Sequence, residues 1–255
     1  IISQFLSAAL VMYSLSHTDA PYGIRWKRLT LEKDLLGSIL SIGLPSGAQQ
    51  AITSFSNVFV QAYINVFGSA CMAGWSSYNK LDIFLLIPVQ SIALASTTFV
   101  GQNYGAGRLE RARQGMRDSL ILSLFITALL SGLLILCDQW MLLLFTTDPE
   151  VIAYGERFIT LISPFYVTIC FIQIYAGALR GVGDGRTPML VMLGSYVAFR
   201  QAYLLANRQL GGGFVPVALS YPVAWVLCAL LLLFFYRRSV ICRSGAEPKS
   251  LDGPA

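Results

Sequence analysis

Residues 41–67 read SIGLPSGAQQAITSFSNVFVQAYINVF, a stretch apolar enough to enter a bilayer yet marked by a polar side chain at nearly every turn. The polar positions are separated by three or four residues, the spacing that keeps side chains on one face of an α-helix. They are Ser46, Gln50, Ser54, Asn57, Gln61 and Asn65. At a rise of about 1.5 Å per residue the stripe extends for roughly 30 Å, the thickness of a hydrocarbon core. The sequence therefore predicts a membrane-crossing helix with one polar face.

Two environments suit such a face. Unpaired amides and hydroxyls turned toward lipid would each cost on the order of 1 to several kcal/mol, so we expect the face to meet a water-filled cavity or other helices. Hydrogen bonds between helices are a common use of such residues. Polar residues across the full span favour the cavity, and interhelical contacts remain the alternative.

The composition indicates an all-α polytopic membrane protein. Of the 255 residues, 55% are hydrophobic and 12% are charged, whereas soluble proteins carry about 25% charged residues. The five cysteines lack the spacing of a disulfide framework or a metal site, and we expect no cofactor. Glycine-rich runs at residues 101–107 and 181–185 follow no predicted β-strand, which argues against nucleotide binding, and no hydrolase motif is present. We therefore expect a protein that is not an enzyme.

The distribution of apolar runs divides the chain into four segments. Residues 1–15 are apolar but reach only about 22 Å, so we expect the end of a truncated transmembrane helix whose upstream sequence is missing. Residues 16–37 predict a cytoplasmic amphipathic connector, residues 38–238 a six-helix transmembrane lobe, and residues 239–255 a polar cytoplasmic tail. Within the lobe, residues 68–81 are expected to form a turn region before a span at 82–100, and Asp148 with Pro149 marks a helix start. A second stripe of polar or small residues between 163 and 180 is expected to face the same cavity as the first.

Positive charge gathers on one side of these spans. Fourteen of the 18 Lys and Arg residues lie at one set of alternate ends, and the other four are Lys80, Arg157, Arg200 and Arg208. By the positive-inside rule the richer side, which includes the C-terminus, is cytoplasmic. Orientation thus explains the basic excess, and nothing points to a nucleic-acid partner.

Four motifs carry a resemblance to a known transporter family. They are GLPSG at 43–47, AGW at 73–75 with NKLD at 79–82, FVGQNYGAG at 99–107, and GALRGVGD at 177–184. In this order they resemble the second half of a multidrug and toxic compound extrusion (MATE) transporter, from the end of its sixth helix through its twelfth. The resemblance implies two six-helix lobes around a central cavity, the missing N-terminal lobe belonging to the same polypeptide. It also implies export of small cationic or amphipathic organic compounds in exchange for H⁺ or Na⁺, in the lipid bilayer of a bacterial cytoplasmic (inner) membrane.

The resemblance also places ion-coupling acids, and here the chain departs from part of the family. Many relatives carry a glutamate where this chain has Thr53 and an aspartate where it has Cys170, while Tyr166 is kept. A carboxylate at mid-membrane costs about 2.5 to 3.5 kcal/mol on insertion scales, so its absence implies that this half has no obvious cation ligand. We therefore expect the coupling acid in the missing first half. Asp82 is expected to cap an outer helix end, and Arg200 to snorkel outward.

Five residues are the candidates for cavity-lining contacts with substrate: Gln50, Asn57, Gln61, Tyr166 and Gln173. The nearest alternative is a lipid-linked oligosaccharide flippase of a related superfamily, which would need a more basic cavity, whereas Lys and Arg are almost absent from the span centres. A non-transporting half-gene product is a further alternative. An upstream six-helix lobe with a buried aspartate would favour the exporter.

Overall fold

The computed structural model describes residues 2–18, 23–24 and 32–242, and it divides into two compact units, Ile1–Ser41 and Ile42–Ala255. The first unit contains α1 (Ile2–Ser16), which has no buried side chain, and the beginning of α2 (Lys33–Asn65). Half of the expected connector at 16–37 and most of the expected tail at 239–255 lie outside the described residues. Both therefore stay predictions.

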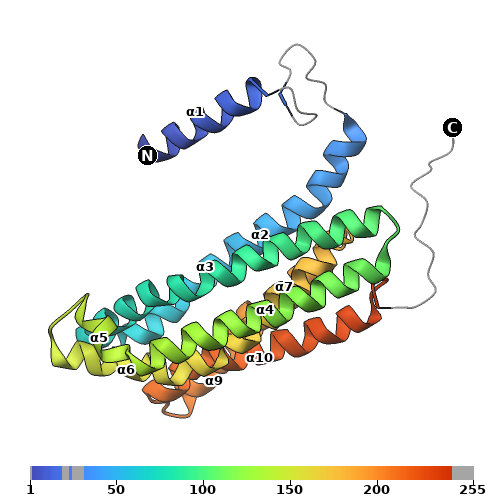
Figure 1. The fold of residues 1–255 in the computed structure, drawn as a ribbon. Coiled ribbons are helices and arrows are strands. Elements are labelled where there is room, and N and C mark those ends of the chain that lie inside the picture. The colour runs from blue at the N-terminus through green and yellow to red at the C-terminus, as the bar shows by residue number, and fades with distance from the viewer. Residues whose placement is uncertain (1, 19–22, 25–31, 243–255) are drawn as a thin grey trace. The chain divides into compact units, whose positions relative to one another are not determined.

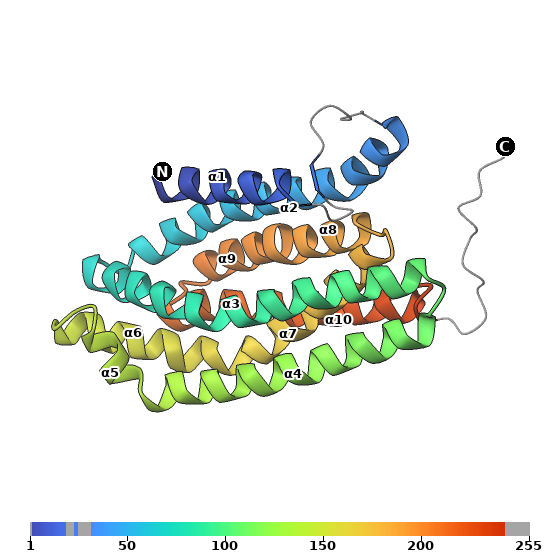
Figure 2. The same cartoon turned by 45° about the horizontal axis from the view of Figure 1, so that its top comes forward.

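The second unit is a bundle of helices, whose long members run side by side in Figures 1 and 2. After α2 come α3 (Ser69–Gly105), α4 (Leu109–Leu136), α5 (Asp138–Leu143), α6 (Pro149–Ile162), the 3₁₀ turn η2 (Ser163–Phe165), α7 (Tyr166–Gly181), α8 (Arg186–Leu193), the π-helical η3 (Gly194–Phe199), α9 (Arg200–Gln209) and α10 (Phe214–Arg238). α3 packs against α4, α6 and α7, while α10 packs against α6, α7 and α9. No strand occurs among the residues that the structure describes.

Five helical segments within the described residues are long and apolar enough to cross a membrane. They are Ser69–Gly105, Leu109–Leu136, Pro149–Gly181, Arg186–Gln209 and Phe214–Arg238. α2 has 33 residues but is not among the five, because its polar stripe lowers the mean hydropathy of the helix. The predicted all-α polytopic fold is thus confirmed, and a sixth crossing by α2 stays a prediction.

The expectation that residues 68–81 form a turn region is wrong. The turn ends at Gly68, whose φ of 94° suits glycine, and α3 begins at the next residue, Ser69. The polar residues that interrupt the apolar pattern are accommodated within the helix, where Asn79 Nδ2 donates to the carbonyl oxygen of Trp75 at 2.9 Å. Asp82 therefore lies in the interior of α3 and does not cap a helix end.

The helix predicted to start at Asp148 and Pro149 is confirmed as α6. The Asp148 carboxylate accepts the backbone N–H two residues further on at 2.9 Å, and Pro149 occupies the first turn. At its other end α6 tightens into η2 around Pro164, which has no N–H to continue the helical ladder. Ser131 Oγ of α4 donates to the carbonyl oxygen of Ser163 at 2.9 Å, so this break inside the span stays hydrogen-bonded.

The second stripe, on η2 and α7, mostly faces the interior of the lobe. The stripe consists of Ser163, Tyr166, Cys170, Gln173, Gly177 and Arg180, and all of these except Gln173 and Arg180 are buried. Cys170 Sγ donates to Thr127 Oγ1 of α4 at 3.1 Å, a contact between helices. These four residues thus pack within the lobe, and the expectation that the stripe lines the same cavity as the α2 stripe stays a prediction.

Glycines allow α7 to cross α3 at close range. A Cβ added at Gly181 would lie 2.8 Å from the carbonyl oxygen of Thr97 and 3.2 Å from the nitrogen of Gly101. A Cβ at Gly177 would meet the hydroxyl of Thr97. Small residues at such crossings let backbones approach, which is how membrane helices gain van der Waals contact.

Candidate functional site

Residues 42–66, most of them in α2, present three distinct faces. The first packs into the lobe and contains Gln49, Ser56, Val60 and Ile64. The second, here called the polar face, contains exposed Gln50, Ser54, Asn57 and Asn65 with half-buried Ser46 and Gln61. The third is apolar and exposed, with Leu44, Ile52, Phe55, Val58, Phe59 and Val66. Their centres lie roughly 100° to 140° apart around the helix, so α2 can meet lipid and water on different sides.

The structure places three of the five predicted contact residues on one surface. Gln50, Asn57 and Gln61 share the polar face of α2, whereas Tyr166 and Gln173 lie on α7. Tyr166 is 1% exposed inside the lobe, and Gln173 is half-buried. Within the described part of the chain, no hydrogen bond joins the α2 set to the α7 set. Substrate contact by any of the five stays a prediction.

Arg200 lies inside the lobe, so the expectation that it snorkels outward is wrong. It is 3% exposed, and its guanidinium lies 4.8 Å from the centroid of the Tyr221 ring. Its Nη2 donates to Asn57 Oδ1 at 2.7 Å and to Ser56 Oγ at 3.2 Å. Gln201 Nε2 donates to the same Ser56 Oγ at 2.9 Å. Asn57 therefore helps to attach α2 to α9, in addition to its place on the polar face.

Asp82 joins α3 to the first residue of α7. Tyr166 donates its hydroxyl to Asp82 Oδ1, and Tyr166 Oη lies 2.6 Å from Oη of Tyr78, one turn before Asp82. Two indoles flank these phenols, with ring centroids 5.2 Å apart for Trp75 and Tyr78 and 5.8 Å apart for Trp225 and Tyr166. The result is a half-buried carboxylate at one end of a short chain of hydroxyls.

Sequence reasoning placed Asp82 at a helix end because the helix that carries it was expected to begin at residue 82. When α3 is read from Ser69, residues 71, 75, 78, 82, 85 and 89 recur at intervals of four, three, four, three and four. All of these except Asp82 are buried, and Asp82 is half-buried. This helical spacing is the signal that would have placed a carboxylate on the packed face of α3.

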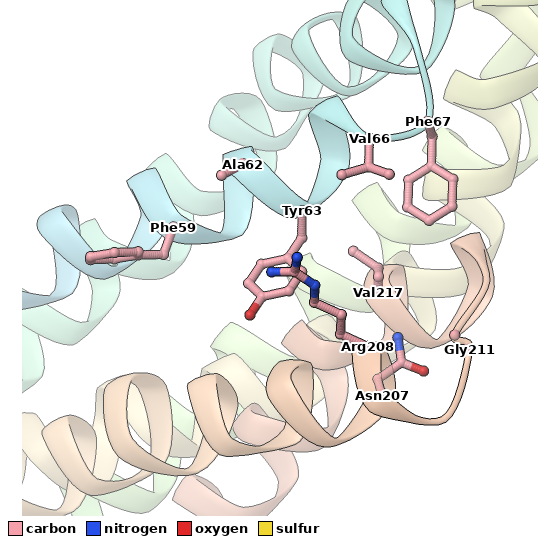
Figure 3. Close-up of a pocket in the computed structure, with 10 residues that line it drawn as sticks. Phe59, Ala62, Tyr63, Val66, Phe67, Asn207, Arg208, Gly211 and Val217 are labelled. Carbon is pink, nitrogen blue, oxygen red and sulfur yellow. The ribbon is translucent and has the colours of Figure 1, made fainter.

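A cavity of about 480 Å³ opens between the end of α2 and the turn from α9 to α10 (Figure 3). Phe59, Tyr63 and Phe67 line it from α2 and the turn after it, and Asn207 and Arg208 line it from α9. None of the five predicted contact residues belongs to its lining. Its walls are mainly aromatic and aliphatic, and nothing in the described residues shows what covers it.

Comparisons with known proteins agree with this architecture. A family model described as MatE matches residues 45–200, more than half of the chain. The chain is 25% identical over 215 residues to the probable multidrug resistance protein YoeA of Bacillus subtilis, covering 82% of the chain and 45% of the relative. It is 26% identical over 200 residues to a FAD transporter of Shewanella oneidensis, covering 77% of the chain and 43% of that relative. The chain spans about half the length of the curated relatives it matches.

The fold is shared with solved transporters. A MOP superfamily transporter from Pyrococcus furiosus superposes with a TM-score of 0.87 at 17% identity, over 95% of this chain and 56% of that one. At this identity the likeness concerns the fold alone. The MatE match and the transporter relatives confirm the expectation that the protein is not an enzyme. Because the family model covers more than half of its residues, the chain belongs to the MatE, or multidrug and toxic compound extrusion, family.

Proposed function

We propose that this chain forms the C-terminal lobe of a secondary active exporter of small organic compounds. The observation that supports the proposal is the polar face of α2, which is exposed and separate from both the packed face and the apolar face. An exposed row of amides is unfavourable against lipid, whereas the wall of a water-filled cavity requires one. The opposing wall would come from an N-terminal six-helix lobe of the same polypeptide.

The proposed substrates are cationic or amphipathic compounds, exchanged for H⁺ or Na⁺ across a bacterial cytoplasmic membrane with the C-terminus inside. The polar face carries amides and hydroxyls without Lys or Arg, and Arg200, which donates to Asn57, is buried behind it, so the face offers a cation hydrogen-bonding groups without an exposed positive charge. The same absence disfavours the flippase, which needs a basic cavity. The relatives are named for multidrug resistance and for FAD transport, and these names supply two contrasting probes, a lipophilic cation and an anionic dinucleotide.

Cysteine labelling tests whether water reaches the polar face. The background is the full-length polypeptide containing this chain, reconstituted in liposomes, with its native cysteines replaced, here Cys71, Cys137, Cys170, Cys228 and Cys242. Gln50→Cys and Gln61→Cys should react with a membrane-impermeant maleimide. Phe55→Cys and Val58→Cys, on the apolar face, should stay unlabelled because lipid excludes the reagent. Equal labelling of the two pairs would contradict the cavity.

A transport assay tests the substrate class. The same liposomes are loaded with ethidium or FAD, and efflux is followed under an imposed H⁺ gradient and then an Na⁺ gradient. Gln61→Leu should lower ethidium efflux about 2- to 10-fold, the effect of losing one neutral hydrogen bond. Phe55→Leu, on the apolar face of α2, should leave the rate of ethidium efflux unchanged. Efflux of FAD alone would contradict the proposed substrate class, and efflux without either gradient would contradict antiport.

A further inference from the structure

A hydrogen bond between Arg200 and Asn57 connects a buried charge to the polar face of α2. Arg200 is 3% exposed, whereas Asn57, whose Oδ1 accepts from Arg200 Nη2 at 2.7 Å, is exposed. We propose that this bond fixes the Asn57 amide with its nitrogen outward, so that Asn57 binds substrates through a hydrogen-bond acceptor of the substrate. Arg200 is then a positioning residue that acts through Asn57. The site rests on the proposed function, for which it specifies one chemical group of the substrate.

The two ends of an amide are chemically different. The oxygen accepts hydrogen bonds, the nitrogen donates them, and the two atoms diverge from the same carbon. Because the Arg200 guanidinium holds the Asn57 oxygen toward the interior of the lobe, the nitrogen turns toward the exposed side of α2. Turning the amide over would place its N–H groups against the guanidinium, which has donors only. The buried charge therefore permits one orientation of this side chain.

Ser56, the second acceptor of the guanidinium, cannot replace Asn57 because its bonding capacity is already used. Ser56 Oγ accepts from Arg200 Nη2 at 3.2 Å and from Gln201 Nε2 at 2.9 Å. It donates to the carbonyl oxygen of Tyr196, in the π-helical η3, at 3.4 Å. A hydroxyl has one donor and two acceptor sites. Rotation of the Asn57 oxygen away from Arg200 would thus leave a buried N–H unpaired, which opposes that rotation.

The surroundings of Arg200 are formed by residues of this chain. Its guanidinium lies 4.8 Å from the centroid of the Tyr221 ring on α10, and its acceptors Ser56 and Asn57 are on α2. Because this chain already buries the guanidinium, a lobe that faces the polar face would meet Asn57 and not Arg200. The positive charge also polarises the Asn57 amide and strengthens its outward donors. A carbonyl, ester or carboxylate oxygen fits such a donor.

A substrate that binds in this way has two chemical groups. Its acceptor oxygen meets Asn57, while its positive charge stays away from Arg200 because like charges repel. Gln61, one turn further along α2, is held by the opposite end of its amide, since its Nε2 donates to Asn65 Oδ1 at 2.9 Å. The Gln61 oxygen is thus the end that suits a cationic group. The face fits compounds whose acceptor oxygen lies about 6 Å from a positive charge.

Equilibrium dye binding tests the acceptor preference without any transport. Tetramethylrhodamine methyl ester and tetramethylrosamine carry the same single positive charge, and only the first has an ester carbonyl. Their Kd values for the full-length polypeptide in nanodiscs are measured by fluorescence anisotropy, with empty nanodiscs as the correction for lipid partitioning. Asn57→Asp keeps an acceptor for Arg200 but has no N–H, so the ratio of the two Kd values should shift against the ester dye by about 2- to 10-fold.

Asn65→Asp is the matched control. It adds the same negative charge to the polar face about 12 Å from Asn57, and it keeps the oxygen that accepts from Gln61. The added charge attracts both dyes equally, so the ratio of their Kd values should not change. An unchanged ratio in Asn57→Asp, or an equal shift in Asn65→Asp, overturns the proposal. Binding of neither dye to the wild type overturns it as well.

Two substitutions of Arg200 test the positioning role, and they decide the matter if Asn57→Asp does not fold. Arg200→Met removes the donor that holds the Asn57 oxygen, so the ratio should again shift against the ester dye. Arg200→Lys keeps a charged donor and should retain the wild-type ratio. A purely structural role of Arg200 would weaken the binding of both dyes equally, and an unchanged ratio in Arg200→Met therefore overturns the proposal.

The dye ratio and the efflux assay separate this site from the exporter. The expected shift in the ratio, together with a failure of ethidium efflux under both gradients, would count against the exporter and support the orientation of the Asn57 amide. Gradient-driven efflux with a ratio that Asn57→Asp leaves unmoved would support the exporter and overturn the role of Arg200 and Asn57.

Discussion

The crossing of α3 and α7 makes a strong prediction for Gly181→Ala. The new Cβ would lie 2.8 Å from the carbonyl oxygen of Thr97, whereas ordinary contacts begin at 3.4 Å. The obstacle is backbone and cannot rotate away, so the helices must part by more than half an ångström. Overpacking of this kind costs about 1 to 3 kcal/mol, set against a gain of about 0.5 to 1 kcal/mol from replacing a helical glycine by alanine.

Gly132→Ala is the matched control, because a Cβ at Gly132 in α4 meets nothing within 4 Å. Gly132→Ala should gain only the stability that comes from replacing a helical glycine by alanine. The two variants should therefore differ in unfolding free energy by about 1 to 3 kcal/mol. The assay is denaturant unfolding of the full-length polypeptide in mixed micelles, followed by helical circular dichroism. Equal stability of Gly181→Ala and Gly132→Ala would refute the close approach of the two backbones.

Three further substitutions test individual hydrogen bonds in the same unfolding assay. Asn57→Leu should lower the free energy of unfolding by about 1 to 3 kcal/mol because it leaves buried Arg200 short of an acceptor. Gln50→Leu, on the same face, should lower it by less. Equal effects of the two substitutions would disprove the Asn57 contact. Asp148→Ala should cost about 1 kcal/mol through loss of the α6 cap, and an unchanged midpoint would show that the cap does not form. Tyr78→Phe should cost about 0.5 to 1.5 kcal/mol by removing a buried hydroxyl bond, with a neutral result arguing against that bond.

Patterns along the chain predicted the elements well where apolarity and helical spacing coincide. Residues 119–136 of α4 and 214–235 of α10 are predominantly apolar, and the Asp148-Pro149 start is a local signal that depends on neighbouring residues only. The six-residue stripe of α2 likewise falls on one face, apart from the packed side. These features need no knowledge of the rest of the fold.

The remaining features depend on which neighbour a face meets, and spacing alone does not reveal that. The stripes of α2 and α7 have the same periodicity, yet the first is largely exposed while Cys170 and Gly177 of the second touch other helices. Arg200 was expected at the surface because a charge in lipid is costly, but acceptors on α2 and the Tyr221 ring satisfy it inside. Tertiary contacts thus decided both cases.

The glycine crossing has a mechanical consequence. Where the backbones of α3 and α7 approach each other at Gly101 and Gly181, the two helices cannot move closer. Asp82 lies about 28 Å along α3 from this contact. A rotation of α3 by about 5° about the contact would therefore displace Asp82 by about 2.4 Å, more than the Tyr166 hydrogen bond can follow. The hydrogen bond between Asp82 and Tyr166 thus opposes any rotation of α3 about the glycine contact.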